Sequence, residues 1–265
     1  MKKIIAAVFI VGFSIILLYL FTDFFTKIKV KKPVGNYLSE HYGIKDGDFK
    51  ILSAYENLLA GVDIETYIEI KQPYHTTTHV GVDPNSYEID EEEGKEVFLD
   101  IFKGAYIQQH SDVLKQSEKI IKKYKLLSES PDAYQISRKN FYYYLKFTID
   151  EQQAKELLIE FKQKQKLNTK KIIKTLNISE SKINTHYEGV INFHFDYEVE
   201  KGKGNIPDIQ SIMNDYEKSN VLTEGIYSIE LQPRNPEEIL DGDSSIIVFS
   251  VDQSGEFQVI KKLIR

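Results

Sequence analysis

The chain of 265 residues contains no cysteine and no tryptophan, and the missing cysteines exclude several classes of protein. They exclude disulfides, cysteine-ligated zinc, iron–sulfur clusters, thiol catalysis and a lipid-modified cysteine anchor. Serine-nucleophile motifs of the Gly-x-Ser-x-Gly type and phosphate-binding glycine loops are absent as well. These absences favour a protein that is not an enzyme and that holds no cofactor.

Positive charge is in the minority, since the chain has 34 basic against 40 acidic residues and a net charge of −6. Residues 1–26 contain two lysines and one aspartate, so the remainder has 32 basic and 39 acidic residues, a net charge of −7. An acidic body repels a phosphate backbone. We therefore expect no nucleic-acid partner.

The longest stretch without charge runs from Ile4 to Phe21 and contains 18 residues. A helix needs about 20 apolar residues to cross roughly 30 Å of hydrocarbon, and the aromatic residues at 24 and 25 suit the lipid–water boundary. A cleaved signal peptide would have a shorter core and a small-x-small cleavage site, which residues 19–28 lack. The sequence thus predicts a transmembrane anchor over residues 1–26, with the membrane as partner.

The direction of this anchor is set by two opposing signals. Four lysines between residues 27 and 32 outnumber Lys2 and Lys3, and this count favours an outside amino terminus. Two lysines before an N-terminal apolar core are the usual layout of an export signal, and the later lysines suit anionic headgroups. We expect a single-pass protein of the cell membrane with an extracytoplasmic C-terminal body.

The rest of the chain divides at the segment 128–132, which contains Pro131. We expect a basic stalk at 27–33, an α+β subdomain with a long helix at 34–128, and an α+β subdomain with an antiparallel sheet at 129–265. No β-α-β rhythm is visible, so the predicted class is α+β: a transmembrane helix followed by two small helix-plus-antiparallel-sheet subdomains.

Hydrophobic periodicity gives the expected elements. Helices are predicted at 34–42, 91–127 with a break near 109–112, from 150 onward, 168–177 and 207–218, and strands at 49–55, 64–70, 75–82, 141–147, 189–200, 226–231, 245–251 and 256–262. The strand at 189–200 alternates most clearly, and His194 lies on its polar face. An exposed position or a cross-strand pair is expected there.

Two short stretches carry a resemblance to a known group of proteins. They are Tyr37-Leu-Ser-Glu-His-Tyr-Gly43 and Asp48-Phe-Lys-Ile51. This segment resembles small membrane-anchored Firmicutes proteins with cystatin-like or PepSY-like extracytoplasmic domains, which begin with a helix, a Tyr-Gly turn and a strand. The resemblance implies a location in a Gram-positive cell envelope and no common catalytic site.

The candidate metal site is the pair His75 and His79, because histidines four residues apart share a face of a helix or of a strand. Asp83 and Glu88 are further candidate ligands only by their proximity in sequence. Thr76 stands where a His-Glu-x-x-His metalloprotease has glutamate, and the threonines between the histidines favour a strand with an exposed pair. Both interpretations stay open at this stage.

Other stretches have simpler explanations. Asp241 to Ser245 suits turn residues before a hairpin better than a calcium loop, because no glutamate completes an EF-hand. The aromatic run 141–147 suits strand packing better than a ligand platform. Six lysines between 162 and 174 suit a solvated helix face, with anionic wall polymer or lipid as the alternative.

The sequence thus predicts a membrane-anchored, non-enzymatic binding or regulatory module with a protein partner in the envelope. The alternatives are a metal-binding protein or metal-dependent enzyme centred on His75 and His79, and a structural subunit of a larger membrane machine.

Overall fold

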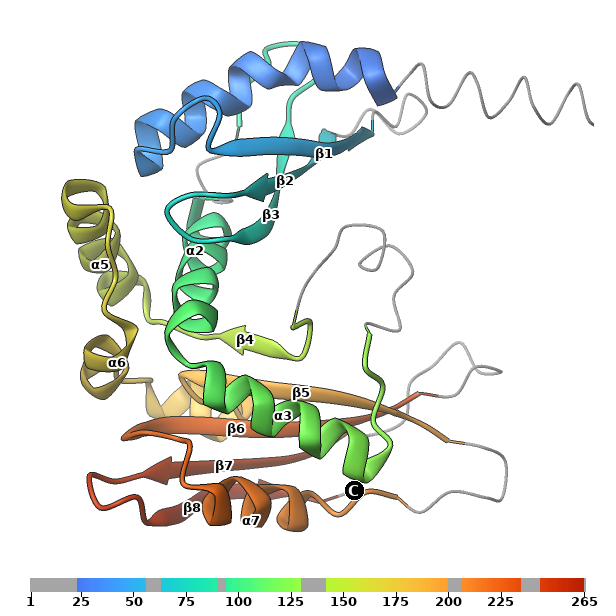
Figure 1. Ribbon diagram of the computed structural model, residues 1–265, viewed down its shortest axis with the longest axis vertical. Helices are drawn as coiled ribbons and strands as arrows, with labels where there is room; N and C mark the ends of the chain where they lie inside the picture. The colour runs from blue at the N-terminus through green and yellow to red at the C-terminus, as the bar shows by residue number, and fades with distance from the viewer. Residues whose placement is uncertain are drawn as a thin grey trace, which may run out of the picture. The chain divides into compact units, whose positions relative to one another are not determined.

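The computed structural model describes residues 23–55, 63–89, 94–129, 142–199, 206–234 and 244–264. Helices and two separate sheets are mixed, and the predicted α+β class is confirmed (Figure 1). Residues 1–22, which form nearly all of the predicted anchor at 1–26, lie outside the described residues. Within the described ranges, no helix combines the length and the apolar character that a membrane crossing needs.

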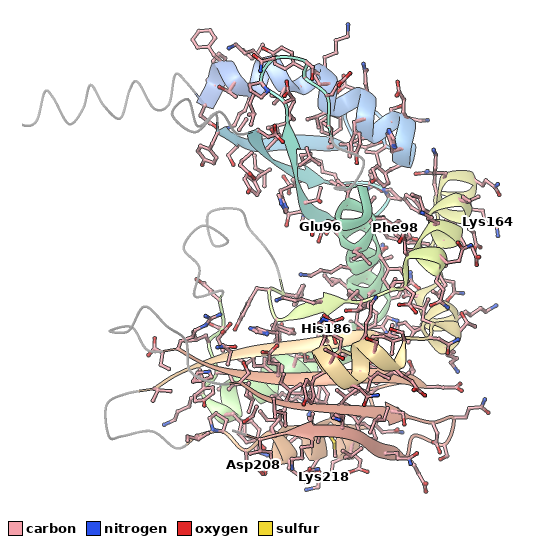
Figure 2. All side chains as sticks on the ribbon, turned by 180° about the vertical axis from the view of Figure 1, so that it is seen from behind. Glu96, Phe98, Lys164, His186, Asp208 and Lys218 are labelled. Atoms are coloured by element: carbon pink, nitrogen blue, oxygen red, sulfur yellow. The ribbon has the colours of Figure 1, made fainter. Side chains whose placement is uncertain are left out.

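The chain forms two compact units, which are described separately. The first contains residues 1–73 and 77–97, and the second contains residues 74–76 and 98–265. The division thus falls within α2 (Gly94–Gln109), on which Figure 2 labels Glu96 and Phe98. The sequence places the division at residue 128 instead.

The first unit begins with a helix whose described part covers residues 23–42. Val30, Val34 and Leu38 are fully buried, and their spacing of four places them on one face. Residues 27–33, expected as a stalk, are therefore helical, and the helix does not start at Pro33. Burial of this face offsets the hydrogen bond that the proline removes.

The sheet of the first unit has the order β1-β2-β3. The strands are β1 (Phe49–Tyr55), β2 (Ile64–Ile70) and β3 (Thr76–Val82), as predicted. β1 and β2 are antiparallel, with Phe49 opposite Ile70 and Tyr55 opposite Glu65. The helix is tied to this sheet, because the Ala54 amide donates to Asp23 Oδ1 at 3.0 Å.

The second unit contains α2 from Phe98 onward and α3 (Ser111–Tyr124). The predicted break between these two helices is confirmed at His110. α3 belongs with the second sheet because its buried Ser117 bonds to Tyr216 in α7 (Ile209–Ser219), with 2.7 Å between the oxygens. Among the described residues, this unit also contains the helices α5 (Glu151–Lys164), α6 (Thr169–Ile172), η2 (Ile173–Thr175) and the π-helix η3 (Lys182–His186).

The second sheet has the order β4-β5-β6-β7-β8. Its strands are β4 (Leu145–Phe147), β5 (Ile191–Glu198), β6 (Gly225–Arg234), β7 (Ser245–Val251) and β8 (Phe257–Leu263). The predicted antiparallel pairing is present between β4 and β5, β6 and β7, and β7 and β8, whereas β5 and β6 are parallel. The connection between them contains α7, so this part is a β-α-β unit. Alternation within a strand does not reveal the direction of its neighbour.

The two faces of this sheet differ. One face is apolar and is covered by helices, and Phe193 of β5 stacks on Tyr216 of α7 with ring centres 4.8 Å apart. α3 and α7 lie on the same side of the sheet (Figure 1), and Asp208 and Lys218 mark the ends of α7 in Figure 2. The other face carries the polar residues that alternate with these aromatics.

The aromatic run 141–147 is only partly a strand. Its residues 145–147 form β4, whereas Tyr142 has a φ of 54° and its carbonyl accepts a hydrogen bond from the Leu145 amide at 2.9 Å. Residues 142–144 therefore form a turn, and residue 141 lies outside the described residues. Tyr143 and Tyr144 are nevertheless buried, at 7% and 3% exposure, so the tyrosines pack in the core.

Candidate functional site

The predicted metal ligands His75 and His79 have different surroundings. His79 lies on β3 and stacks on Tyr67, with ring centres 5.6 Å apart and planes 15° apart. His75 precedes β3 and is exposed. Asp83 is engaged in a turn, since its Oδ1 accepts the amides of Asn85 and Ser86 at 2.8 and 2.6 Å. Among the described residues, no group of three or more histidine, aspartate or glutamate side chains is arranged to hold a metal ion. Metal binding by the two histidines stays a prediction.

The most developed polar cluster lies on the polar face of the second sheet. β5 and β6 run side by side in parallel, with His194 opposite Glu230, Asp196 opposite Gln232 and Glu198 opposite Arg234. Because side chains alternate along a strand, His194 and Asp196 of β5 share a face with Glu230 and Arg234 of β6. The cross-strand pair that the sequence allowed for His194 is therefore present.

These four side chains form one chain of charges. His194 Nδ1 lies 2.7 Å from Glu230 Oε2, and His194 Nε2 lies 3.7 Å from Asp196 Oδ1. On its other side, Asp196 Oδ1 accepts a hydrogen bond from Arg234 Nε at 2.6 Å. The Asp196 side chain is 2% exposed, whereas those of Glu230 and Arg234 are about 30% exposed. The buried Asp196 carboxylate thus lies between His194 and Arg234, whose side chains are 16% and 29% exposed.

The electrostatics of the cluster favour its charged form. Burial would lower the pKa of His194, but hydrogen bonds with Asp196 and Glu230 outweigh it and raise this pKa above its usual value. Burial would raise the pKa of Asp196, but His194 and Arg234 lower it below its usual range. Glu230 behaves likewise: burial opposes ionisation, and His194 lowers its pKa. At neutral pH both carboxylates are ionised.

A second polar network continues from this cluster along the same face. The Asn192 Oδ1 accepts from the Ser228 hydroxyl at 2.6 Å and from the Gly189 amide at 2.8 Å, while its Nδ2 donates to Thr148 Oγ1 at 3.1 Å. Gly189 is required here, because a Cβ at this position would lie 2.5 Å from the Tyr227 carbonyl carbon. Hydrogen bonds of Asn192 therefore join β5 to β6, to the segment after β4 and to the segment before β5 on this face.

This geometry bears on the chemistry that the cluster can perform. A general base needs a ring nitrogen that faces the proton it accepts, and a serine nucleophile needs that base as its hydrogen-bond partner. Both nitrogens of His194 face carboxylates, and the Ser228 hydroxyl bonds to Asn192 instead. The arrangement suits a structural role, in which ion pairs stabilise the parallel pairing of β5 and β6.

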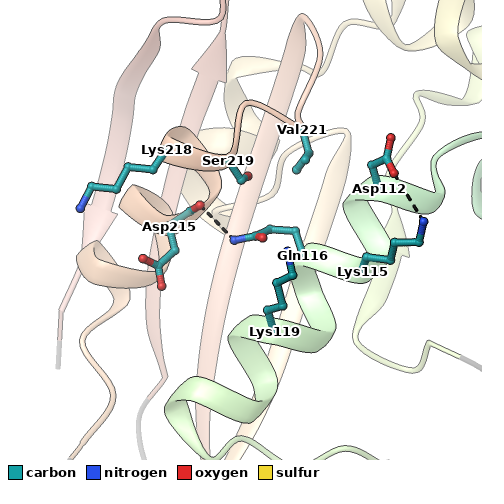
Figure 3. Close-up of a pocket in the computed structure, with 8 residues that line it drawn as sticks. All are labelled: Asp112, Lys115, Gln116, Lys119, Asp215, Lys218, Ser219 and Val221. Carbon is teal, nitrogen blue, oxygen red and sulfur yellow. Dashed lines mark hydrogen bonds and ion pairs between the residues drawn. The ribbon is translucent and has the colours of Figure 1, made fainter.

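A shallow groove of about 510 Å³ lies between α3 and α7 (Figure 3). Gln116 bridges the two helices by donating to the Asp215 carbonyl at 3.1 Å. The Asp215 carboxylate is held by Lys123 at 2.6 Å and by the Tyr124 hydroxyl at 3.0 Å. Lys119 and Lys218 line the groove and make no ion pair within the described ranges, so its edge is basic.

Lys103 in α2 is buried, with 8% exposure. Burial lowers its pKa to about 8, while Asp100 opposes this change and Lys146 adds to it. At pH 7 the side chain is still mostly an ammonium ion.

Sequence reasoning identified His194 but missed Asp196, Glu230 and Arg234. The available signal was the regular alternation of polar residues in both strands. Pairing them needs the parallel register, which depends on the α7 crossover. Residues 241–243 of the Asp241–Ser245 stretch lie outside the described residues.

Comparison with protein-family models, with curated proteins and with solved structures finds no match to this chain.

Proposed function

We propose that the chain is a single-pass membrane protein that presents an extracytoplasmic α+β body as a non-enzymatic binding or regulatory module. The observation that carries the proposal is an apolar patch formed by Phe24, Phe25 and Ile28. These side chains are 57%, 56% and 58% exposed in the first described turns of the helix at 23–42. In the sequence they follow the uncharged run Ile4–Phe21 after Thr22 and Asp23.

An exposed patch of large apolar residues is costly in water. Full burial of one such side chain is worth about 1.5–3 kcal/mol, so covering the exposed half of each yields roughly 1 kcal/mol per residue. The lipid–water boundary provides that cover for residues next to a membrane span. Exposure of these three residues is therefore what the membrane-boundary end of an anchor over residues 1–26 would produce.

The patch is fixed to the first unit. Asp23 Oδ1 accepts the Ala54 amide at 3.0 Å, and its Oδ2 pairs with Lys27 at 2.6 Å. The single acidic residue beside the patch is thus satisfied within the protein. A helix that leaves the bilayer in this way would hold the body close to the membrane surface.

A binding role, in contrast to a catalytic one, is supported by the cluster around His194. Its charged groups are matched to one another across β5 and β6, and both ring nitrogens of His194 face carboxylates. The groove between α3 and α7 offers a surface on which an envelope protein could dock.

Membrane fractionation tests the anchor. The full chain should remain in the membrane pellet after an alkaline carbonate wash. A variant with Val11→Lys and Ile15→Lys should appear in the supernatant, because each lysine near the centre of a span costs about 2.5–3.5 kcal/mol. The matched control is Val259→Lys with Ile260→Lys, since both residues are 43% exposed on β8, and it should stay in the pellet. Release of the unmodified chain by carbonate would refute the proposal.

A further inference from the structure

The second unit carries a surface whose charge is opposite to that of the whole chain. Between Glu160 and Glu180 the sequence has six lysines and no acidic residue, although the net charge of the chain is −6. The lysines lie at the end of α5, in the loop after it and along α6 and η2: residues 162, 164, 166, 170, 171 and 174. All six are exposed, and Figure 2 labels Lys164 on α5.

Most of this charge is not neutralised by neighbouring side chains. Lys164 pairs with Glu160 at 2.8 Å, and Lys174 lies 3.9 Å from Glu224. The other four lysines make no ion pair within the part of the chain that the structure describes. We name them the basic surface: Lys162, Lys166, Lys170 and Lys171. Solvated lysine faces are common. The residues around these four lysines therefore have to show whether they form a binding surface.

The loop that carries the basic surface is fixed by buried hydrogen bonds. Leu167 is 3% exposed, and its amide donates to the Tyr74 hydroxyl at 2.6 Å while its carbonyl accepts from Gln109 Nε2 at 2.7 Å. Thr169 is fully buried; its amide and hydroxyl both donate to Gln109 Oε1, and its hydroxyl lies 3.1 Å from His110 Nε2. The backbone between the lysines is therefore held in place, and binding requires little further ordering of the loop.

The hydrogen bond at His110 does not depend on a charged imidazole. Burial, assisted by the nearby Lys170, lowers the pKa of His110 to about 4. The ring is thus neutral at physiological pH. The hydrogen bond between His110 and Thr169, which helps to hold the loop of the basic surface, is therefore present throughout the neutral pH range.

An apolar side chain adjoins the basic surface. Ile159 of α5 is 58% exposed and precedes Lys162 by three residues, so the two share a face of the helix. Exposed aliphatic side chains beside lysines suit the interface of a bilayer, where the apolar group enters the acyl boundary and the ammonium groups meet phosphates. A soluble polyanion would use the lysines but not Ile159.

We propose that the basic surface, together with Ile159, contacts anionic phospholipid headgroups. The inference rests on the proposed membrane anchor, which would keep the second unit within reach of a bilayer. Each lysine close to an anionic surface contributes about 1 kcal/mol, which strengthens the association roughly fivefold. With four lysines, the basic surface should therefore be in contact with the bilayer in most molecules of an anchored chain.

Lysine footprinting in lipid nanodiscs tests the inference. The full chain is placed in discs of phosphatidylcholine alone or with 30% phosphatidylglycerol, and acetylation of each lysine is followed by mass spectrometry. We expect labelling of the basic surface to fall at least threefold in the anionic discs and to recover in 0.5 M salt. Lys115, Lys119 and Lys122 are exposed on α3 in the same unit and should be labelled equally in both discs.

A variant with glutamine at all four positions of the basic surface supplies the second readout. It should lose the protection of the remaining Lys164 and Lys174 in anionic discs. The control variant carries the same loss of charge elsewhere in the second unit and should keep that protection: Lys115→Gln, Lys119→Gln, Lys122→Gln and Lys218→Gln. Equal labelling in neutral and anionic discs would overturn the inference.

Protection by soluble polyphosphate but not by anionic discs would overturn it in favour of a soluble polyanion. If the chain does not enter discs at all, the proposed anchor fails, and sedimentation with anionic vesicles decides the inference separately. In that case the unmodified chain should sediment and the glutamine variant should not. Failure of both to sediment would contradict it.

Discussion

The contact between Arg234 and Asp196 gives the sharpest test of the second sheet. Arg234 Nε lies 2.6 Å from Asp196 Oδ1, and the Asp196 side chain is 2% exposed. In Arg234→Met the stem of the side chain remains and the charge is lost. Removal of one partner from a buried ion pair costs about 3–5 kcal/mol, because the other charge stays buried. Since Arg234 is 29% exposed and water can enter, we expect a loss near 3 kcal/mol.

Urea unfolding of the full chain in mild detergent, followed by circular dichroism, measures this loss at pH 7. The control is Lys164→Met, which removes an exposed ion pair with Glu160 on α5 and should cost less than about 0.5 kcal/mol. Combining Arg234→Met with Asp196→Asn should restore much of the stability, because no unpaired charge remains. Equal losses in Arg234→Met and Lys164→Met would refute the reasoning.

We also expect the loss of stability in Arg234→Met to depend on pH. Arg234 helps to lower the pKa of Asp196 in the folded protein, so the stability that this carboxylate contributes is present above its unfolded pKa near 4 and is lost as pH falls through the folded value. The difference between the unmodified chain and Arg234→Met should therefore stay constant from pH 7 to about 4 and shrink as pH falls below about 4. A difference that does not shrink below about pH 4 would contradict the assignment.

Three further predictions concern single side chains. The pKa of His194 is raised, so its contribution to the free energy of unfolding is complete below about pH 6.5 and is lost as pH rises through the folded pKa. Urea unfolding from pH 6 to 8 should show this loss in the unmodified chain and not in His194→Gln. Tyr74→Phe leaves the buried Leu167 amide without its acceptor and should cost about 1–3 kcal/mol by the same assay; an unchanged midpoint would contradict this. If His75 and His79 hold a metal, the purified chain should retain zinc or copper in stoichiometric amount by atomic emission, and alanine at both positions should abolish it; metal-free protein would end that hypothesis.

Local periodicity predicted much of the fold, because it reports which face of an element is buried. The strands β1 to β3, the break at His110 and the polar position of His194 all follow from spacing within short windows. The helix through Pro33 did not follow from these rules. Proline is read as a helix start, and its tolerance here depends on the buried Val30 and Val34.

The candidate site was less predictable, since it depends on pairing between distant segments. His194 and Glu230 lie 36 residues apart, and their contact requires β5 and β6 to be parallel and in one register. Parallel pairing is set by the α7 crossover and not by the strand sequences themselves. The lysines from 162 to 174 were visible in the sequence, but the hydrogen bonds that fix their loop were not.

Protease treatment of intact bacterial cells without their wall, with a tag at the carboxyl terminus, tests the central claim most directly. If the chain is anchored by its N-terminal run with the body outside, the tag should disappear from intact cells, while a cytoplasmic marker protein stays whole. A tag that survives until detergent opens the membrane would place the body inside, and the account of an extracytoplasmic binding module would be wrong.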